Sequence, residues 1–95
     1  MANKQRVHII VSGRVQGVFF RDFTRQQANN LGITGWVKNL PDGKVQIVAE
    51  GDKDKLLQLI EAVKVGPSSA KVKDCQIKWL EFSGEFRDFE IIYWD

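Results

Sequence analysis

The chain has 95 residues, of which 43% are hydrophobic, 11% aromatic and 27% charged, and its formal net charge is +2. This length and composition predict a single globular domain, residues 1–95, and exclude a disordered tail. The small net charge argues against a nucleic acid or a membrane surface as partner. The two halves of the chain nevertheless differ in charge. Residues 1–47 carry seven Lys or Arg and two acidic residues, for a net charge of +5, and residues 48–95 carry seven Lys or Arg and ten acidic residues, for a net charge of −3.

The sequence holds one cysteine, one histidine and one methionine. A lone cysteine cannot form an internal disulfide, and we expect Cys75 to be a small buried hydrophobe rather than a reactive thiol. Too few soft ligands are present for a structural zinc site. No apolar run approaches the ~20 residues that a membrane span needs. An unpaired thiol fits a reducing compartment, so we expect a cytoplasmic protein.

The first half of the chain predicts a strand, a helix and a hairpin. Alternating apolar residues over 7–11 indicate the first strand, and apolar residues at helical spacing indicate a helix from Asp22 to Leu31 that ends at Gly32. Residues 33–50 are expected to form a β-hairpin, because two apolar strands flank the turn residues Pro41-Asp42-Gly43.

The second half predicts one more helix and two strands. Asp52 or Asp54 is expected to cap the helix, and Gly66-Pro67 to end it. Its apolar stripe comprises Leu56, Leu59, Ile60 and Val63. Alternation predicts a fourth strand over Cys75, Ile77 and Trp79, and a fifth over Phe89, Ile91 and Tyr93 that continues to the C-terminus.

This order of elements is typical of the ferredoxin-like α+β sandwich, a split βαβ fold (βαββαβ) with one C-terminal strand added. We expect a mixed, largely antiparallel sheet with both helices on one face. A right-handed crossover would make the first two strands parallel, with their C-terminal ends at one edge of the sheet. The loop after the first strand and Asn39, near the end of the second, should therefore lie at the same edge.

The loop Gln16-Gly17-Val18-Phe19-Phe20-Arg21 joins the first strand to the first helix. Unpaired N–H groups at a helix N-terminus attract anions, Gly17 allows successive N–H groups to converge, and Arg21 adds a guanidinium. The Walker pattern and the dinucleotide-binding glycine pattern are both absent, which argues against NTP, Mg²⁺ or NAD chemistry.

Two longer motifs make the interpretation specific. Residues 13–21, Gly-Arg-Val-Gln-Gly-Val-Phe-Phe-Arg, preceded by Val11, resemble the first signature of the acylphosphatase family. Residues 35–39, Gly-Trp-Val-Lys-Asn, followed by Gly43, Val45 and Gly51, resemble the second. Neither stretch departs from the family pattern.

The resemblance implies hydrolysis of the carboxyl–phosphate bond of small acyl phosphates to a carboxylate and phosphate, without metal or cofactor. Inorganic phosphate would be product and inhibitor, and the enzyme would work as a monomer. By position, the backbone of residues 16–21 would cradle the phosphoryl group, Arg21 would bind its oxygens and Asn39 would hold the attacking water. An acyl phosphate is already activated, so positioning and charge stabilisation suffice, and a neutral amide does not repel the dianion. Either Asn39 or the substrate phosphate could take the water's proton.

Other polar and aromatic residues have simpler interpretations. His8 lies mid-strand and is expected to be a packed or edge residue rather than a general base. Arg14, Arg25 and Lys38 are expected to be solvated surface charges. The aromatic residues near the loop and hairpin are expected in the core, with one of them able to rim the site; they are Phe19, Phe20, Phe23 and Trp36.

Two other functions compete with hydrolysis. Ferredoxin-like sheets also form RNA-recognition domains, but these need aromatic residues on the third strand, and residues 44–50 have none. A closer rival is a sensor that binds acyl or carbamoyl phosphate in the same pocket without hydrolysing it, which the fold alone does not distinguish from an enzyme.

Overall fold

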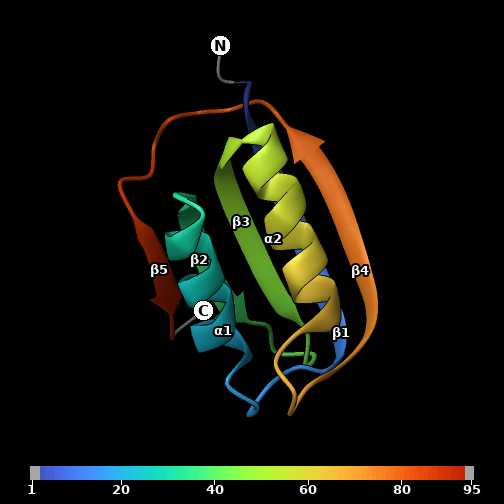
Figure 1. The fold of residues 1–95 in the computed structure, drawn as a ribbon. Helices are drawn as coiled ribbons and strands as arrows, with labels where there is room; N and C mark the ends of the chain where they lie inside the picture. The colour runs from blue at the N-terminus through green and yellow to red at the C-terminus, as the bar shows by residue number, and fades with distance from the viewer. Residues whose placement is uncertain (1–2, 94–95) are drawn as a thin grey trace.

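The computed structural model describes residues 3–93. Five strands and two helices follow the expected order, and the strands form one sheet in the order β4-β1-β3-β2-β5 (Figure 1). The elements are β1 (Lys4–Arg14), α1 (Phe20–Asn30), β2 (Thr34–Asn39), β3 (Val45–Asp52), α2 (Lys53–Val65), β4 (Lys71–Leu80) and β5 (Phe89–Ile92).

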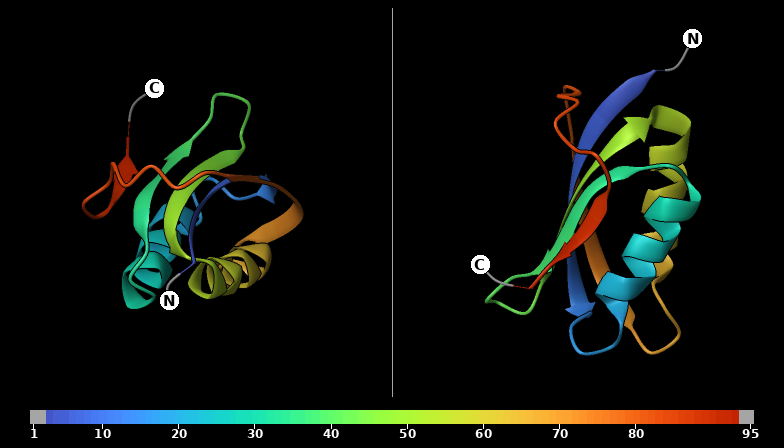
Figure 2. Two further views of the ribbon diagram at one scale, coloured as in Figure 1. Left: turned by 90° about the horizontal axis from the view of Figure 1, so that it is seen from above. Right: turned by 90° about the vertical axis from the view of Figure 1, so that its left-hand side faces the viewer.

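Both helices cover the same face of the sheet, and the hydrophobic core lies between the two layers (Figure 2, right). Val7, Ile9 and Val11 of β1 are fully buried beneath the helices, and the predicted stripe of α2 is buried against the sheet. The predicted ferredoxin-like α+β fold is therefore confirmed. In the described part of the chain, no helix has the length and apolarity that crossing a membrane would require.

The strand directions bring two distant segments together. β1 and β2 each pair antiparallel with β3, so they run parallel to one another. Val45 at the start of β3 is paired with both Val11 of β1 and Asn39 of β2. The prediction that the loop after β1 and Asn39 share one edge of the sheet is confirmed.

The helix boundaries differ from expectation in instructive ways. α1 begins at Phe20 rather than Asp22, because the Phe20 ring is buried and its carbonyl accepts a hydrogen bond from Thr24 Oγ1 (2.9 Å). It ends as predicted: the N–H groups of Gly32 and Ile33 donate to the carbonyls of Asn29 (3.3 Å) and Ala28 (2.9 Å), which is a Schellman motif.

The expected cap of α2 is only partly right. Asp52 is the N-cap residue, but its side chain accepts no capping hydrogen bond, and Asp54 lies inside the helix. The Lys53 N–H instead donates to the Asn3 carbonyl (2.9 Å), so the backbone just before β1 satisfies a helix-end donor. The helix ends at Val65 with Gly66 as its C-cap residue, in agreement with the prediction that Gly66-Pro67 stops it.

The last two strands also differ from the prediction. β4 begins at Lys71, earlier than its apolar alternation suggested, because its first residues pair with the end of β1 across a bulge between Ser12 and Gly13. The fifth strand was expected to reach the C-terminus, but β5 ends at Ile92; residues 94–95 lie outside the described residues.

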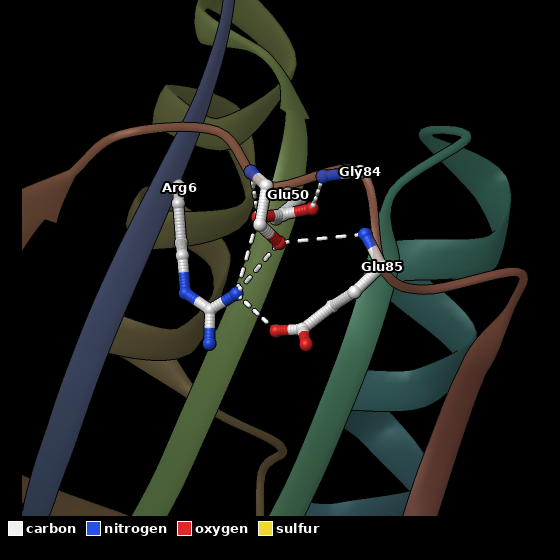
Figure 3. Close-up of polar contacts among 5 residues, drawn as sticks. Arg6, Glu50, Gly84 and Glu85 are labelled. Carbon is white, nitrogen blue, oxygen red and sulfur yellow. Dashed lines mark hydrogen bonds and ion pairs between the residues drawn. The ribbon is translucent and has the colours of Figure 1, made fainter.

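A buried carboxylate fixes the connection that leads to β5. Glu50 is 1% exposed and accepts hydrogen bonds from Ser83 N–H (2.8 Å), Ser83 Oγ (2.8 Å), Gly84 N–H (3.0 Å) and Arg6 Nη1 (3.2 Å). Arg6 also pairs with Glu85 (Figure 3). This network holds the connection on the sheet face away from the helices, from where the chain enters β5 beside β2.

Candidate active site

The loop between β1 and α1 has two residues in the left-handed region. Gly17 has φ +71° and Phe19 has φ +62°. Val15, which precedes these two residues, and Val18, which lies between them, are buried and attach the loop to the core. A left-handed conformation at a non-glycine residue costs about 1–3 kcal/mol and is maintained only where the surroundings impose it.

This loop leaves the first turn of α1 without hydrogen-bond acceptors. Phe19 is the N-cap residue, and in the described part of the chain no side chain caps the helix. The first bond of the helical ladder runs from Phe23 N–H to the Phe19 carbonyl (3.0 Å), so the N–H groups of residues 20–22 have no intrahelical partner. Free N–H groups at the positive end of the helix dipole form an anion-binding site.

Two side chains hold the loop from opposite sides. Gln16 Nε2 donates to the carbonyls of Leu40 and Lys44, each at 2.8 Å, and so joins the loop to the β2–β3 turn. Ser69 Oγ, in the α2–β4 connection, donates to the Val18 carbonyl (2.9 Å). The loop is therefore shaped by the protein itself.

A cavity of about 270 Å³ opens beside the loop. It is lined by Val15, Gly17, Phe19, Phe20, Arg21, Asp22, Asn39, Ile91 and Tyr93. The structure thus brings Arg21 and Asn39, eighteen positions apart, to one cavity. Of the six predicted loop residues, Gln16 and Val18 are not among the lining residues, because one side chain binds the hairpin and the other enters the core.

Among the residues that the structure describes, Arg21 is the only Lys or Arg that lines the cavity. Its guanidinium carbon lies 4.9 Å from the centre of the Tyr93 ring, and no carboxylate among residues 3–93 lies within ion-pairing distance of it. A cation at a helix N-terminus is unfavourable by about 0.3–1 kcal/mol. The neighbouring Asp22 carboxylate lies 3.7 Å from Arg25, so Arg21 remains available for an anionic ligand.

Asn39 is the last residue of β2, and its Oδ1 atom is buried with no hydrogen-bond partner within residues 3–93. A buried acceptor that lacks a donor costs about 1–3 kcal/mol. Because Asn39 lines the cavity, a water or ligand donor within it can satisfy this oxygen.

The remaining candidates lie elsewhere. His8 alternates with the core residues of β1, so it occupies the uncovered sheet face; burial, with the charges of Arg6 and Lys78, lowers its pKa. Arg14 and Lys38 are also absent from the cavity lining. Phe20 is buried as expected, whereas Phe19 is 77% exposed and lines the cavity, so among the four aromatic residues it is the one that rims the site instead of packing in the core.

Sequence analysis missed Ile91 and Tyr93 as cavity residues. It predicted the fifth strand but not its neighbour. β5 pairs parallel with β2, with Lys38 opposite Ile92, so the next residue along each segment, Asn39 at the end of β2 and Tyr93 just after β5, lies at the same level. Predicting that parallel pairing would have placed Tyr93 at the site.

The cavity offers N–H donors, one guanidinium and one amide oxygen. Within residues 3–93, no three His, Cys, Asp or Glu side chains are grouped in a way that could hold a metal ion. The donors present suit a compact oxyanion, with the amide oxygen able to hold a water beside it.

Comparisons with known proteins agree with this chemistry. The family model described as Acylphosphatase matches residues 7–91. An acylphosphatase from Pyrobaculum calidifontis is 51% identical over 88 residues, which cover 92% of this chain and 80% of that protein. One from Pelotomaculum thermopropionicum is 44% identical over 91 residues, covering 96% and 99%. The crystal structure of acylphosphatase from Bacillus subtilis aligns with a TM-score of 0.91 at 42% identity, covering 94% of this chain and 99% of that chain.

Proposed function

The chain belongs to the acylphosphatase family and is an enzyme that hydrolyses acyl phosphates, and from this premise we propose that the cavity beside the β1–α1 loop is its active site. One observation carries the proposal. The unpartnered Asn39 oxygen and the Arg21 guanidinium line one cavity with a loop that leads into an uncapped helix.

The phosphoryl group binds in the loop. Backbone N–H groups of Gln16, Gly17, Val18, Phe19, Phe20 and Arg21 surround its oxygens, and the Arg21 guanidinium donates to them from the side. Donors fixed before the reaction stabilise the charge that develops on the equatorial oxygens during in-line displacement. The hydrogen bonds made by Gln16 and Ser69 support this role, because they hold the loop in shape.

Asn39 positions the nucleophile. Its Oδ1 accepts a hydrogen bond from a water, whose oxygen attacks phosphorus while the bond to the acyl oxygen breaks. The carboxylate leaves with that electron pair. An amide oxygen is too weakly basic to keep the water's proton, so a phosphoryl oxygen takes it, and the dianionic substrate and water yield a carboxylate and dihydrogen phosphate. This sequence of steps uses no metal or cofactor.

The proposal includes the state in which the enzyme works. The loop, Arg21 and Asn39 already meet at one cavity within a single copy of the chain, so the proposed steps need no residue from a second copy, and we propose a monomer made of a single domain, residues 1–95. Its partners are the acyl phosphate and inorganic phosphate, with no nucleic acid or membrane, and its location is the cytoplasm. Sedimentation at assay concentrations and cell fractionation test these points; a catalytically required dimer or a membrane-bound fraction would contradict them.

The test is hydrolysis of benzoyl phosphate, followed by its absorbance with EDTA present. Arg21→Ala is expected to lower kcat/KM by ~10²–10³ and to weaken inhibition by phosphate, because a principal donor is lost. Asn39→Ala is expected to lower kcat by a similar ~10²-fold while phosphate inhibition persists, because only the water loses its anchor.

Asp22→Asn is the matched control. It removes the carboxylate that lines the cavity and is expected to keep kcat within about threefold, since an exposed charge has a modest effect. A large loss in this variant would make Asp22 the base. Full activity of Asn39→Ala would remove the water-positioning role, and EDTA-sensitive turnover would overturn the metal-free steps.

A further inference from the structure

Two exposed aromatic rings stand at the cavity. Phe19 is 77% exposed and Tyr93 is 71% exposed, and both line the cavity with Arg21. They come from opposite ends of the chain: Phe19 precedes α1 and Tyr93 follows β5. Large apolar rings are seldom left in water without a reason when they gather at one concavity.

Packing does not account for the Phe19 ring. Its neighbour Phe20 is 1% exposed and fills the core, whereas Phe19 has a left-handed backbone, which is unfavourable for a residue with a Cβ. The fold would lose little buried apolar area with a smaller residue at position 19. An outlying conformation combined with an exposed ring indicates a function outside the core.

The Tyr93 ring lies against the guanidinium proposed to bind phosphate. The 4.9 Å separation of the Arg21 guanidinium carbon and the ring centre is a cation–π contact, and a guanidinium in such a contact still has N–H groups that can donate to an oxyanion. In an acyl phosphate the acyl group is bonded to a phosphoryl oxygen. A substrate held by Arg21 therefore brings its acyl group within reach of these rings.

The cavity has room for that group. Its volume of about 270 Å³ is close to the lower end of the range, ~300–1,000 Å³, of sites that hold whole small molecules. Val15 and Ile91 add apolar lining, while the polar lining residues are Arg21, Asp22 and Asn39. One part of the cavity suits a phosphoryl group and another an apolar substituent.

We propose that Phe19 and Tyr93 form an acyl-group subsite that favours acyl phosphates with an aromatic or similarly bulky apolar acyl group over acetyl phosphate. The proposal rests on the proposed function of the same cavity. The two rings bury their exposed apolar surface against the acyl group and stack with an aromatic one.

The test compares kcat/KM for benzoyl phosphate and acetyl phosphate, each corrected for its uncatalysed rate, in wild type, Tyr93→Ala and Phe19→Ala. We expect each substitution to lower the benzoyl-to-acetyl ratio about tenfold. Tyr93→Phe should keep the ratio because the ring remains. Phe82→Ala removes an exposed aromatic residue in the β4–β5 connection and should leave the ratio unchanged.

If the benzoyl-to-acetyl ratio in both alanine variants stays within about twofold of the wild-type ratio, the subsite proposal is overturned. Even one methylene group more or less in a hydrophobic pocket changes kcat/KM by more than this. A parallel fall for both substrates with unchanged ratio would show that Tyr93 acts only on Arg21. If the wild type hydrolyses neither substrate, the proposed function itself fails, which separates the two hypotheses. Melting temperature and phosphate inhibition identify a variant that has merely unfolded.

Discussion

At the scale of single residues, Gln16 joins the two parts of the site. Its Nε2 donates to the carbonyls of Leu40 and Lys44, which also accept backbone bonds within the turn, from Gly43 N–H (3.1 Å) and Leu40 N–H (2.8 Å) respectively. The side chain therefore sets the distance between the β1–α1 loop and the hairpin that carries Asn39. Gln16 acts as a positioning residue through its side chain.

We expect Gln16→Ala to lower stability by about 1–3 kcal/mol, because two hydrogen bonds are lost, although both carbonyls keep a backbone N–H donor. It should lower kcat for benzoyl phosphate about tenfold or more, since a small displacement of a positioned group has large kinetic effects. Gln16→Glu should be worse, as its carboxylate would face two carbonyl oxygens. The measurements are thermal unfolding and kcat.

Gln26, an exposed glutamine on α1, provides the matched control. Gln26→Ala should change stability by less than about 0.5 kcal/mol, as is usual for surface substitutions. Unchanged kcat and melting temperature in Gln16→Ala would show that the loop and hairpin keep their spacing without this side chain.

At the scale of elements, Glu50 anchors the connection between β4 and β5. Burial of the carboxyl raises its pKa, but the hydrogen bonds from Ser83 and Gly84 and the Arg6 guanidinium outweigh burial, so the pKa is lowered. A carboxyl whose folded-state pKa is lowered stabilises the fold above its unfolded-state pKa, near ~4.3 for Glu. That contribution is lost as the pH falls through the lower, folded-state value.

Glu50→Gln is expected to lower stability by about 2 kcal/mol at pH 7, because donors that met a carboxylate would meet an amide. The gap from wild type should narrow below about pH 4, where Glu50 itself becomes protonated. Urea unfolding from pH 7 to pH 3 measures both. Glu85→Gln, whose carboxylate also pairs with Arg6 but is 55% exposed, should cost less than about 1 kcal/mol. A pH-independent gap would contradict this account.

Some of the helices and strands could be predicted from the sequence and others could not. Apolar alternation and spacing predicted the helices, the hairpin and the shared edge of β1 and β2, because these follow from burial on one face. The start of β4 was missed because Lys71 and Lys73 carry no apolar pattern, and their strand comes from backbone pairing with β1. Tyr93 was missed as a cavity residue because the sequence of a short strand does not indicate which other strand of the sheet it pairs with. Gln16 was assigned to the cradle, yet its side-chain contacts depend on where the hairpin folds back.

At the scale of the whole molecule, the cavity is assembled at one end from segments near both ends of the chain. Residues 15–22, Asn39 and residues 91–93 meet there, and Ser69 supports the loop from the α2–β4 connection (Figure 1). The start of α2 lies at the opposite end of the molecule. The site therefore depends on the complete sheet rather than on the loop alone.

This arrangement determines how the net charge acts on the substrate. The molecule measures 37 × 25 × 22 Å, so at ~0.01 M salt, where the Debye length is ~30 Å, charges throughout the protein act on a dianion at the cavity. At ~1 M salt the Debye length is ~3 Å, and only charged groups in contact with the ligand still interact with it. Since the net charge is +2 and Arg21 lines the cavity, added NaCl should raise KM and leave kcat unchanged.

Two charge-reversal variants distinguish the effect of a charge close to the cavity from the effect of the protein's net charge. Arg14 is exposed at the end of β1, just before the loop, and Lys55 lies in the first turn of α2 at the far end; each reversal changes the net charge by the same amount. At low salt, Arg14→Glu should lower kcat/KM for benzoyl phosphate several-fold more than Lys55→Glu, because the interaction falls with distance, and the difference should disappear at high salt. If the two variants lower kcat/KM equally, or if their difference persists at high salt, electrostatic attraction by basic residues near the cavity does not govern substrate capture.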